Sequence, residues 1–245
     1  MNSFNDTPPI LSNRFSDNQL QKNSDYIYEI LENTKNLPQT FDKNKLAILI
    51  SGPSGSGKDS IVDLLPDSFL RIKTCTTRQI RPEEIGKDPY IRLSVKEFEE
   101  GTNNHEFLET DLFDGNYYGS KLSEINKVIL QGKIPILRIN PTGAKNAMNI
   151  SKETPEVLKG LNILYFYIVP PSEEILKKRI FKRDVESVLD LDKRKEAEIK
   201  AIKRFEGTVL KDLELSKHAH FIAINFEGKL KEVTENILKT FNNFL

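Results

Sequence analysis

Residues 46–58 read Leu46-Ala47-Ile48-Leu49-Ile50-Ser51-Gly52-Pro53-Ser54-Gly55-Ser56-Gly57-Lys58, and this stretch decides the fold. Its first five residues form a continuous apolar run, which is typical of a strand buried on both faces of a parallel sheet. A glycine-rich turn follows directly, and the apolar residues Ile61, Leu64 and Leu65 after it have helical spacing. A strand, a glycine-rich turn and a helix in this order form the context of a phosphate-binding loop.

The residues of this loop are suited to holding the phosphates of ATP. Glycines let successive backbone N–H groups turn toward an anion, the helix adds the positive end of its dipole, and Lys58 supplies a charge for the β and γ phosphates. The usual pattern has Ser or Thr directly after the lysine, where its hydroxyl meets Mg²⁺, whereas this chain has Asp59 and then Ser60. Either Asp59 or Ser60 can therefore hold the metal. The predicted ATP-binding residues here are Gly52, Pro53, Ser54, Gly55, Ser56, Gly57, Lys58, Asp59 and Ser60.

Further apolar runs alternate with helical patterns along the chain, which predicts an α/β fold with a parallel core sheet flanked by helices. The other predicted strands are 69–75, 134–139, 163–169 and 221–224, and the predicted helices are 121–130, 173–181 and 229–241. Residues 184–205 are highly charged with a helical period, which favours a solvated, mobile element. Residues 1–23 are expected to be a flexible arm, followed by a short amphipathic helix around Tyr26, Ile27, Ile30 and Leu31.

Charge and composition exclude several classes of protein. Lys and Arg together number 36, as do Asp and Glu, so the net charge of zero argues against a nucleic-acid binder that works by bulk basicity. No apolar run is long enough to span a membrane, and the N-terminus does not resemble a targeting signal, which makes the cytoplasm the expected location. The single Cys75 and three scattered histidines offer no metal-ligand spacing.

A second cluster of polar residues follows the predicted strand 69–75. It contains Arg78 and Arg81, three residues apart, with Tyr90 further on. Two guanidinium groups at this spacing suit a phosphate held by forked hydrogen bonds. Combined with a phosphate-binding loop, the pair indicates a second phosphate site, as in an enzyme with a phosphorylated acceptor.

At these residues the sequence resembles the guanylate kinase family, over residues 45–245. The family's Thr-Thr-Arg-x-x-Arg stretch matches residues 76–81, and its Glu-Phe-Leu-Glu and Gly-Asn-Tyr-Tyr-Gly-Ser segments match residues 106–109 and 115–120. The resemblance implies that the arginines and two tyrosines grip the GMP phosphate and that Glu109, Ser120 and Thr74 contact guanine. The GMP-binding residues so implied are Thr74, Arg78, Arg81, Tyr90, Glu109, Tyr118, Ser120 and Asn140.

The resemblance also implies a fold with a GMP-binding subdomain at about 76–121 and a mobile lid at about 182–205. Arg179 and Arg183 match the arginines that enter the family's lid, and Arg204 is a weaker candidate for a third. Together with Lys58 and Arg78, the first two are the predicted catalytic residues. Asn225 lies where the family contacts adenine. The implied reaction is Mg²⁺-dependent transfer of the γ-phosphate of ATP to GMP or dGMP, by a monomer or a homodimer.

Two departures from the family pattern keep other functions open. The family strand after the acceptor region carries two aspartates where this chain has Arg138 and Asn140, and Arg138 can assist phosphate binding or pair with Asp59. The Gly-Lys-Asp-Ser sequence at residues 57–60 also resembles ribose 1,5-bisphosphate phosphokinases, although those have no need of a guanine-reading pair. A third hypothesis is a non-catalytic guanylate kinase-like module that binds a protein partner, but such modules commonly lose the phosphate loop.

Overall fold

The computed structural model of the chain describes residues 7–16, 18–80, 84–86, 90–113, 115–153, 158, 160–186, 188 and 190–245, without the side chains of residues 191 and 192. The chain forms two compact units. The first contains residues 1–39, 50–65 and 165–244, and the second contains residues 40–49, 66–164 and 245. Strands β3 (Leu46–Ser51) and β10 (Asn162–Val169) have residues in both units.

The first unit is built on strands in the order β1-β2-β11-β10-β3. Strand β11 (Phe221–Ile224) runs parallel to β10, as expected for buried apolar strands. Two strands that the sequence did not predict extend this sheet with antiparallel pairs, because β2 (Ile27–Ile30) pairs with β11 and β1 (Leu20–Lys22) pairs with β2. All residues of β11 are buried.

The first unit also contains helical segments of several types. The helical segments of the first unit are α1 (Pro9–Ser12), α2 (Leu31–Thr34), α3 (Lys58–Val62), α7 (Glu173–Phe181), α8 (Leu191–Arg204), α9 (Leu210–Glu214), α10 (Leu230–Asn242), the π-helical segments Lys182–Glu186 and Phe205–Val209, and the 3₁₀ segment Leu215–His218. Helix α10 packs its buried residues Val233, Ile237 and Phe241 inward. These residues recur every four positions, which is the spacing of one helix face.

The N-terminal segment differs from the prediction. Most of the helix expected around Tyr26, Ile27, Ile30 and Leu31 is strand β2, which lies between β1 and β11 and has Ile27 and Tyr28 buried. Only Leu31 is helical, as the first residue of α2. Part of the expected flexible arm is folded, since Arg14 forms ion pairs with Glu173 at 2.6 Å and with Glu214 at 3.1 Å. The apolar residues of α1 are buried as well.

The second unit contains the strands β10-β3-β9-β4 and a separate four-stranded sheet in the order β6-β5-β8-β7. In the first set, β4 (Phe69–Arg71) runs parallel to β9 (Ile134–Arg138). The strand predicted over residues 69–75 is therefore two strands, because β5 (Thr74–Thr76) belongs to the other sheet. The remaining elements of this unit are β6 (Tyr90–Arg92), β7 (Phe107–Phe113), β8 (Asn116–Lys121), α4 (Val95–Asn103), α5 (Leu122–Ile129), α6 (Pro141–Glu153) and the 3₁₀ segment Lys43–Lys45.

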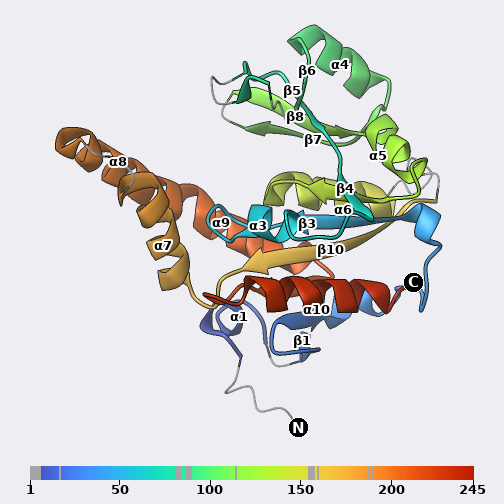
Figure 1. Ribbon diagram of the computed structural model, residues 1–245, viewed down its shortest axis with the longest axis horizontal. Coiled ribbons are helices and arrows are strands. Elements are labelled where there is room, and N and C mark those ends of the chain that lie inside the picture. Colours follow the sequence, from blue (N-terminus) through green and yellow to red (C-terminus); the bar gives the residue numbers. More distant parts are fainter. Residues whose placement is uncertain are drawn as a thin grey trace. The chain divides into compact units, whose positions relative to one another are not determined.

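The four-stranded sheet lies beside α4 in Figure 1 and shares a small apolar core with it. Phe98 of α4 stacks on Phe107 with ring centroids 4.6 Å apart and on Tyr117 with centroids 5.2 Å apart. Stacked aromatic rings hold a helix on a sheet over a large apolar area. This packing fixes β7 and β8, which carry the residues expected to bind guanine. Among the described residues, no helix is long and apolar enough to cross a membrane.

Candidate functional site

The loop between β3 and α3 has the backbone conformation that its glycines allow. Gly52 and Gly57 have positive φ angles of 151° and 89°. A Cβ atom on Gly52 would lie 2.3 Å from the carbonyl oxygen of Ile168, and one on Gly57 would lie 2.2 Å from Nδ2 of Asn225. Side chains at these positions would therefore be excluded by strain and by direct overlap. The loop is a closely packed turn that only this glycine pattern permits.

Two side chains of the loop carry groups that suit an anion. Nζ of Lys58, at the first residue of α3, donates a hydrogen bond to the carbonyl oxygen of Pro53 at 3.2 Å. The Oγ atom of Ser56 is buried and has no hydrogen-bond partner among the described residues. A buried hydroxyl without a partner is costly, and a phosphate oxygen supplies the acceptor it lacks. Lysine and serine on one glycine turn thus fit a phosphate.

Asn225 and Arg179 extend this site from β11 and α7. Asn225, directly after β11, donates from Nδ2 to the carbonyl oxygen of Ser56 at 2.8 Å. Arg179 in the last turn of α7 donates from Nη2 to the carbonyl oxygen of Asn225 at 2.9 Å. Burial lowers the pKa of Arg179. Three residues that the sequence assigned to the ATP side of the site therefore form one hydrogen-bonded group.

Two further arginines contact Ser54 in the same loop. Arg183 donates from Nη2 to Oγ of Ser54 at 3.1 Å, and Arg204 donates from Nη2 to the same oxygen at 2.8 Å. Arg204, the weaker candidate from the sequence, is thus brought beside Arg183. Asp184 links them, with ion pairs of 2.6 Å to Arg183 and 3.1 Å to Arg204. Hydrogen bonding to Arg183 lowers the pKa of Asp184. Asp184 was not among the site residues predicted from the sequence.

The metal candidates lie in the first turn of α3. Asp59 and Ser60 follow Lys58 directly, and both side chains are exposed. The described residues hold no group of three or more His, Cys, Asp or Glu that could bind a metal ion by themselves. The pairing of Asp59 with Arg138, at the end of β9, would join residues of different units and stays a prediction.

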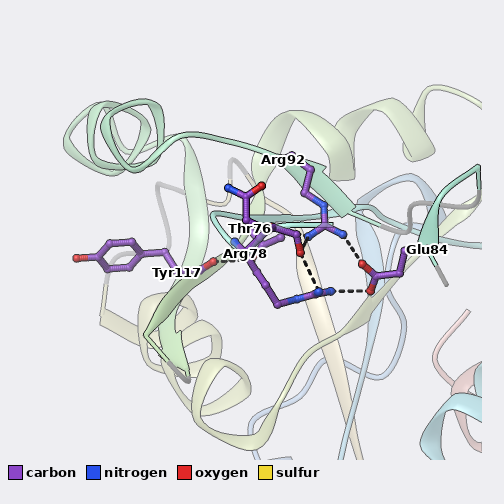
Figure 2. Close-up of polar contacts among 6 residues, drawn as sticks. Thr76, Arg78, Glu84, Arg92 and Tyr117 are labelled. Carbon is purple, nitrogen blue, oxygen red and sulfur yellow. Dashed lines mark hydrogen bonds and ion pairs between the residues drawn. The ribbon is translucent and has the colours of Figure 1, made fainter. Parts of the chain in front are cut away.

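The second unit carries a cluster of cationic and aromatic side chains around Arg78. Glu84 accepts a hydrogen bond from Nη2 of Arg78 at 2.6 Å, which raises the pKa of Arg78 (Figure 2). Tyr90 lies beside this guanidinium, 5.4 Å from its carbon to the ring centroid, and packs edge-on against Tyr118. The structure thus brings together three of the predicted phosphate-binding residues. Arg81, the fourth, lies outside the described residues.

Local backbone contacts fix the start of this cluster. Thr76 of β5 donates from Oγ1 to the carbonyl oxygen of Tyr117 at 2.8 Å and accepts from the backbone N–H of Arg78 at 3.2 Å (Figure 2). Thr74, at the other end of β5, is half-buried and pairs with Tyr90 in the parallel register of β5 and β6. The Thr-Thr-Arg stretch therefore leads from the sheet into the loop that carries Arg78.

Glu109 and Ser120 face each other across strands β7 and β8. They are direct partners in the antiparallel register, so their side chains lie on the same face of the sheet. Oγ of Ser120 donates to Oε1 of Glu109 at 2.7 Å, and the two residues are 1% and 2% exposed. Oε2 of Glu109 is buried with no hydrogen-bond partner among the described residues. Burial raises the pKa of Glu109 to about 7, and the charge of Asp111 contributes in the same direction.

Helix α6 begins beside this carboxylate. A Cβ atom on Gly143 would lie 2.8 Å from Oε2 of Glu109, so the absence of a side chain makes room for that oxygen. Asn140 accepts a hydrogen bond on Oδ1 from the backbone N–H of Gly143 at 2.7 Å and donates from Nδ2 to Asp111. The orientation of the Asn140 amide is therefore fixed by hydrogen bonds at both its oxygen and its nitrogen. Sequence reasoning missed Asp111 and Gly143, although Asp111 lies two residues after Glu109 on one strand and therefore on the same face.

Known proteins are similar to this chain in sequence. The family model described as guanylate kinase matches residues 43–223. The guanylate kinase of Mesomycoplasma hyopneumoniae (strain 7448) is 41% identical over 172 residues, which are 67% of this chain and 86% of that protein. The guanylate kinase of Chlamydia trachomatis serovar D is 32% identical over 171 residues, 67% of this chain and 78% of that protein.

Among solved structures, the crystal structure of guanylate kinase from Anaplasma phagocytophilum matches with a TM-score of 0.48 and 18% identity, and covers 82% of this chain and 86% of that one. The family model covers well over half of the chain, and the relatives from Mesomycoplasma and Chlamydia exceed 30% identity over most of their own length. The chain belongs to the guanylate kinase family.

Proposed function

We propose that this protein transfers the γ-phosphoryl group of ATP to GMP or dGMP. The proposal is supported by membership of the guanylate kinase family and by two groups of residues with suitable chemistry. One group, around Lys58 and Arg179, fits the phosphates and base of ATP. The other, around Arg78 and Glu109, fits the phosphate and base of a purine nucleotide.

The observation that carries the choice of guanine is the Oε2 atom of Glu109. This oxygen is buried without a hydrogen-bond partner among the residues described, while Oε1 is held by Ser120. Guanine presents two adjacent N–H donors, on N1 and N2, and a carboxylate accepts both. Adenine has an acceptor at N1 instead, so it would leave the carboxylate facing a lone pair. Binding of guanine therefore supplies hydrogen bonds to Oε2 of Glu109, a buried atom that is costly to leave without a partner.

The arginines supply alignment and charge neutralisation in this mechanism. The acceptor phosphate is itself the nucleophile and is largely ionised near pH 7, so the transfer needs no strong general base. Arg78 would hold this phosphate in line with the donor, and Lys58, Arg179 and Arg183 would neutralise the charge that develops on the transferring group. Arg204 joins this set because it shares Ser54 and Asp184 with Arg183.

We assign Mg²⁺ binding to Asp59 and Ser60. Both residues present hard oxygen atoms, exposed in the first turn of α3, directly after the lysine that meets the phosphates. Mg²⁺ in kinases is commonly bound by one or two protein oxygens together with water and substrate phosphates, so the small set found here is sufficient. When bound with ATP, the ion would neutralise phosphate charge.

Since ATP and GMP are cytoplasmic metabolites, we also place the enzyme in the cytoplasm.

The two alternative functions have less support. A ribose 1,5-bisphosphate phosphokinase needs no buried acceptor for guanine, yet Glu109 and Ser120 are both buried and bonded to each other. A non-catalytic binding module needs no phosphate loop, yet Gly52 and Gly57 keep conformations that only glycine readily adopts.

The proposal is tested by measuring ADP release from Mg·ATP with a panel of acceptors. The panel contains GMP, dGMP, AMP, CMP, UMP and ribose 1,5-bisphosphate, and the Lys58→Ala variant serves as the blank. We expect turnover with GMP and dGMP that the variant loses. Turnover with ribose 1,5-bisphosphate in place of GMP would overturn the assignment of the substrate, and turnover of GMP by the variant would overturn the role of the loop.

A further inference from the structure

Arg92, in strand β6, has contacts that the roles described so far do not explain. Its Nη2 atom donates to Oε2 of Glu84 at 2.7 Å, while Arg78 donates to Oε1 of the same carboxylate at 2.6 Å (Figure 2). The three side chains are mostly shielded from solvent, with exposed fractions of 24% for Arg92, 15% for Glu84 and 14% for Arg78. One carboxylate is therefore held between two guanidinium groups, with one oxygen on each.

This arrangement is the one in which two arginines bind a phosphate. Arginine forms charge-assisted hydrogen bonds with carboxylates and phosphates through the same N–H groups, and both anions offer oxygens at similar spacing. Glu84 supplies one negative charge against the two positive charges of Arg78 and Arg92. A phosphate dianion would match both charges, and it would need the two Nη2 atoms that Glu84 now occupies. Glu84 and a phosphate therefore compete for the same guanidinium groups.

Arg92 is held in place by contacts that do not involve Glu84. Its Nη1 atom donates to the carbonyl oxygen of Arg78 at 2.6 Å and to that of Gln79 at 3.3 Å. Its guanidinium carbon also lies 5.1 Å from the ring centroid of Tyr90, on which Arg78 packs as well. The Nη2 atom is thereby fixed beside the Nη2 atom of Arg78. An arginine that is already positioned loses little conformational freedom when it binds a phosphate.

We propose that Arg92 is a further ligand of the acceptor's phosphate and that Glu84 occupies the place of this phosphate until the acceptor binds. The inference rests on the proposed function, because it identifies the phosphate as that of GMP. In the family pattern read from the sequence, the phosphate is gripped by Arg78 and Arg81. Arg92 adds a guanidinium from the strand beside Tyr90. It lies two residues after Tyr90, so both side chains leave β6 on the same face.

The first test compares GMP with guanosine as ligands of the full-length protein, measured by isothermal titration calorimetry. For Arg92→Ala and Arg92→Lys we expect GMP to bind about 10-fold or more weakly and guanosine to bind unchanged, because only GMP carries the phosphate. Lys96→Ala is the matched control. It removes a positive charge from α4, where Lys96 is 85% exposed, and we expect it to alter neither affinity.

Two results would overturn the role of Arg92. If GMP binding is unchanged in both variants, Arg92 does not touch the phosphate. If GMP and guanosine lose affinity by the same factor, Arg92 acts on the structure of the unit as a whole. The lysine variant keeps the positive charge and the apolar stem, so it supplies the answer if the alanine variant fails to fold.

The second test uses Glu84→Gln, which keeps the size of the side chain and removes its charge. We expect the KM for GMP to fall several-fold and the KM for ATP to stay unchanged, because the competing anion is gone. A raised or unchanged KM for GMP would mean that Glu84 does not compete with the phosphate. Wild-type protein in the same assay separates this inference from the proposed function. No turnover of GMP by the wild type contradicts both, whereas normal turnover with unaffected variants contradicts only the inference.

Discussion

Replacing Glu109 by glutamine tests how the protein recognises its base, because the buried carboxylate links pH to both stability and binding. Burial raises the pKa of Glu109 from 4.5 to about 7. Between these values the unfolded chain has released a proton that the folded chain still holds, so stability falls as the pH rises. Below pH 4.5 the carboxyl is neutral in both states. Above pH 7 it is charged in both states, and the accumulated loss of stability is about 3 kcal/mol.

Glu109→Gln removes this dependence, since the amide stays neutral at every pH. We expect the free variant to be more stable than the wild type by up to about 3 kcal/mol at pH 8, with the difference shrinking toward pH 5. Urea unfolding of both proteins at pH 5, 6, 7 and 8 measures this difference in the free energy of unfolding. Glu99→Gln makes the same change at an exposed position of α4 and is expected to leave the stability curve of the wild type unaltered.

Guanosine binding should change with pH in the opposite sense. The N–H donors of guanine require the ionised carboxylate, so the ligand must remove a proton from Glu109 below pH 7. The affinity of the wild type should therefore fall by about tenfold between pH 8 and pH 6. Guanosine is used because it lacks the phosphate, whose own ionisation changes in this range. Two results together would show that Glu109 is not a buried carboxyl that binds guanine in its ionised form. They are equal guanosine affinity at pH 8 and pH 6, and a stability difference between wild type and Glu109→Gln that does not vary with pH.

Two further substitutions test the surroundings of the two sites. Gly143→Ala places a methyl group 2.8 Å from Oε2 of Glu109, and displacement of this carboxylate should raise the KM for GMP by about tenfold while the KM for ATP is unchanged. An unaltered KM for GMP would show that the carboxylate has no fixed role. Asp184→Asn weakens the link between Arg183 and Arg204, whose side chains are 50% and 43% exposed, and the loss of about 0.5–1 kcal/mol should lower kcat about two- to fivefold. Steady-state kinetics measures both, and full kcat in the second variant would exclude a role for Asp184 in orienting the arginines.

Much of the strand pattern follows from the sequence, because a strand buried on both faces requires a continuous apolar run. Strand β3 and the parallel strands β9, β10 and β11 were all predicted from such runs. The run over residues 69–75 was wrongly read as one strand. The pairing of its two halves separates them, since Phe69 pairs with Ile134 whereas Cys75 pairs with Gly119 in the other sheet.

In the N-terminal segment, the spacing of apolar residues alone did not distinguish a helix from a strand. Residues 26, 27, 30 and 31 fit one face of a helix, yet Ile27 and Tyr28 are both buried in strand β2. Tyr28 pairs with Ile222 of β11, far away along the chain. A strand packed on both faces has no alternation of apolar and polar residues, so its pattern resembles that of a short buried helix. The partner strand, which the local sequence does not reveal, determined the outcome.

The candidate functional residues also differ in how far the sequence predicts them. Motifs with fixed spacing led to the predictions of Lys58, Glu109 and Ser120, and the structure places the last two opposite each other. Arg92 and Asp184 belong to no such motif, and their proposed roles depend on contacts with Glu84 and Arg204, which lie in other elements of the chain. For Arg92 a signal was present, because it follows Tyr90 by two residues in a strand and so shares its face.

We propose that the protein recognises guanine in the acceptor through Glu109. The most direct test is the ratio of kcat/KM for GMP to that for AMP, measured with saturating Mg·ATP. A site that hydrogen-bonds a particular base rejects an analogue that leaves buried groups without partners, so the ratio should be at least about 1,000 in the wild type. It should fall sharply in Glu109→Gln. Similar kcat/KM values for GMP and AMP in the wild type would show that Glu109 does not select guanine.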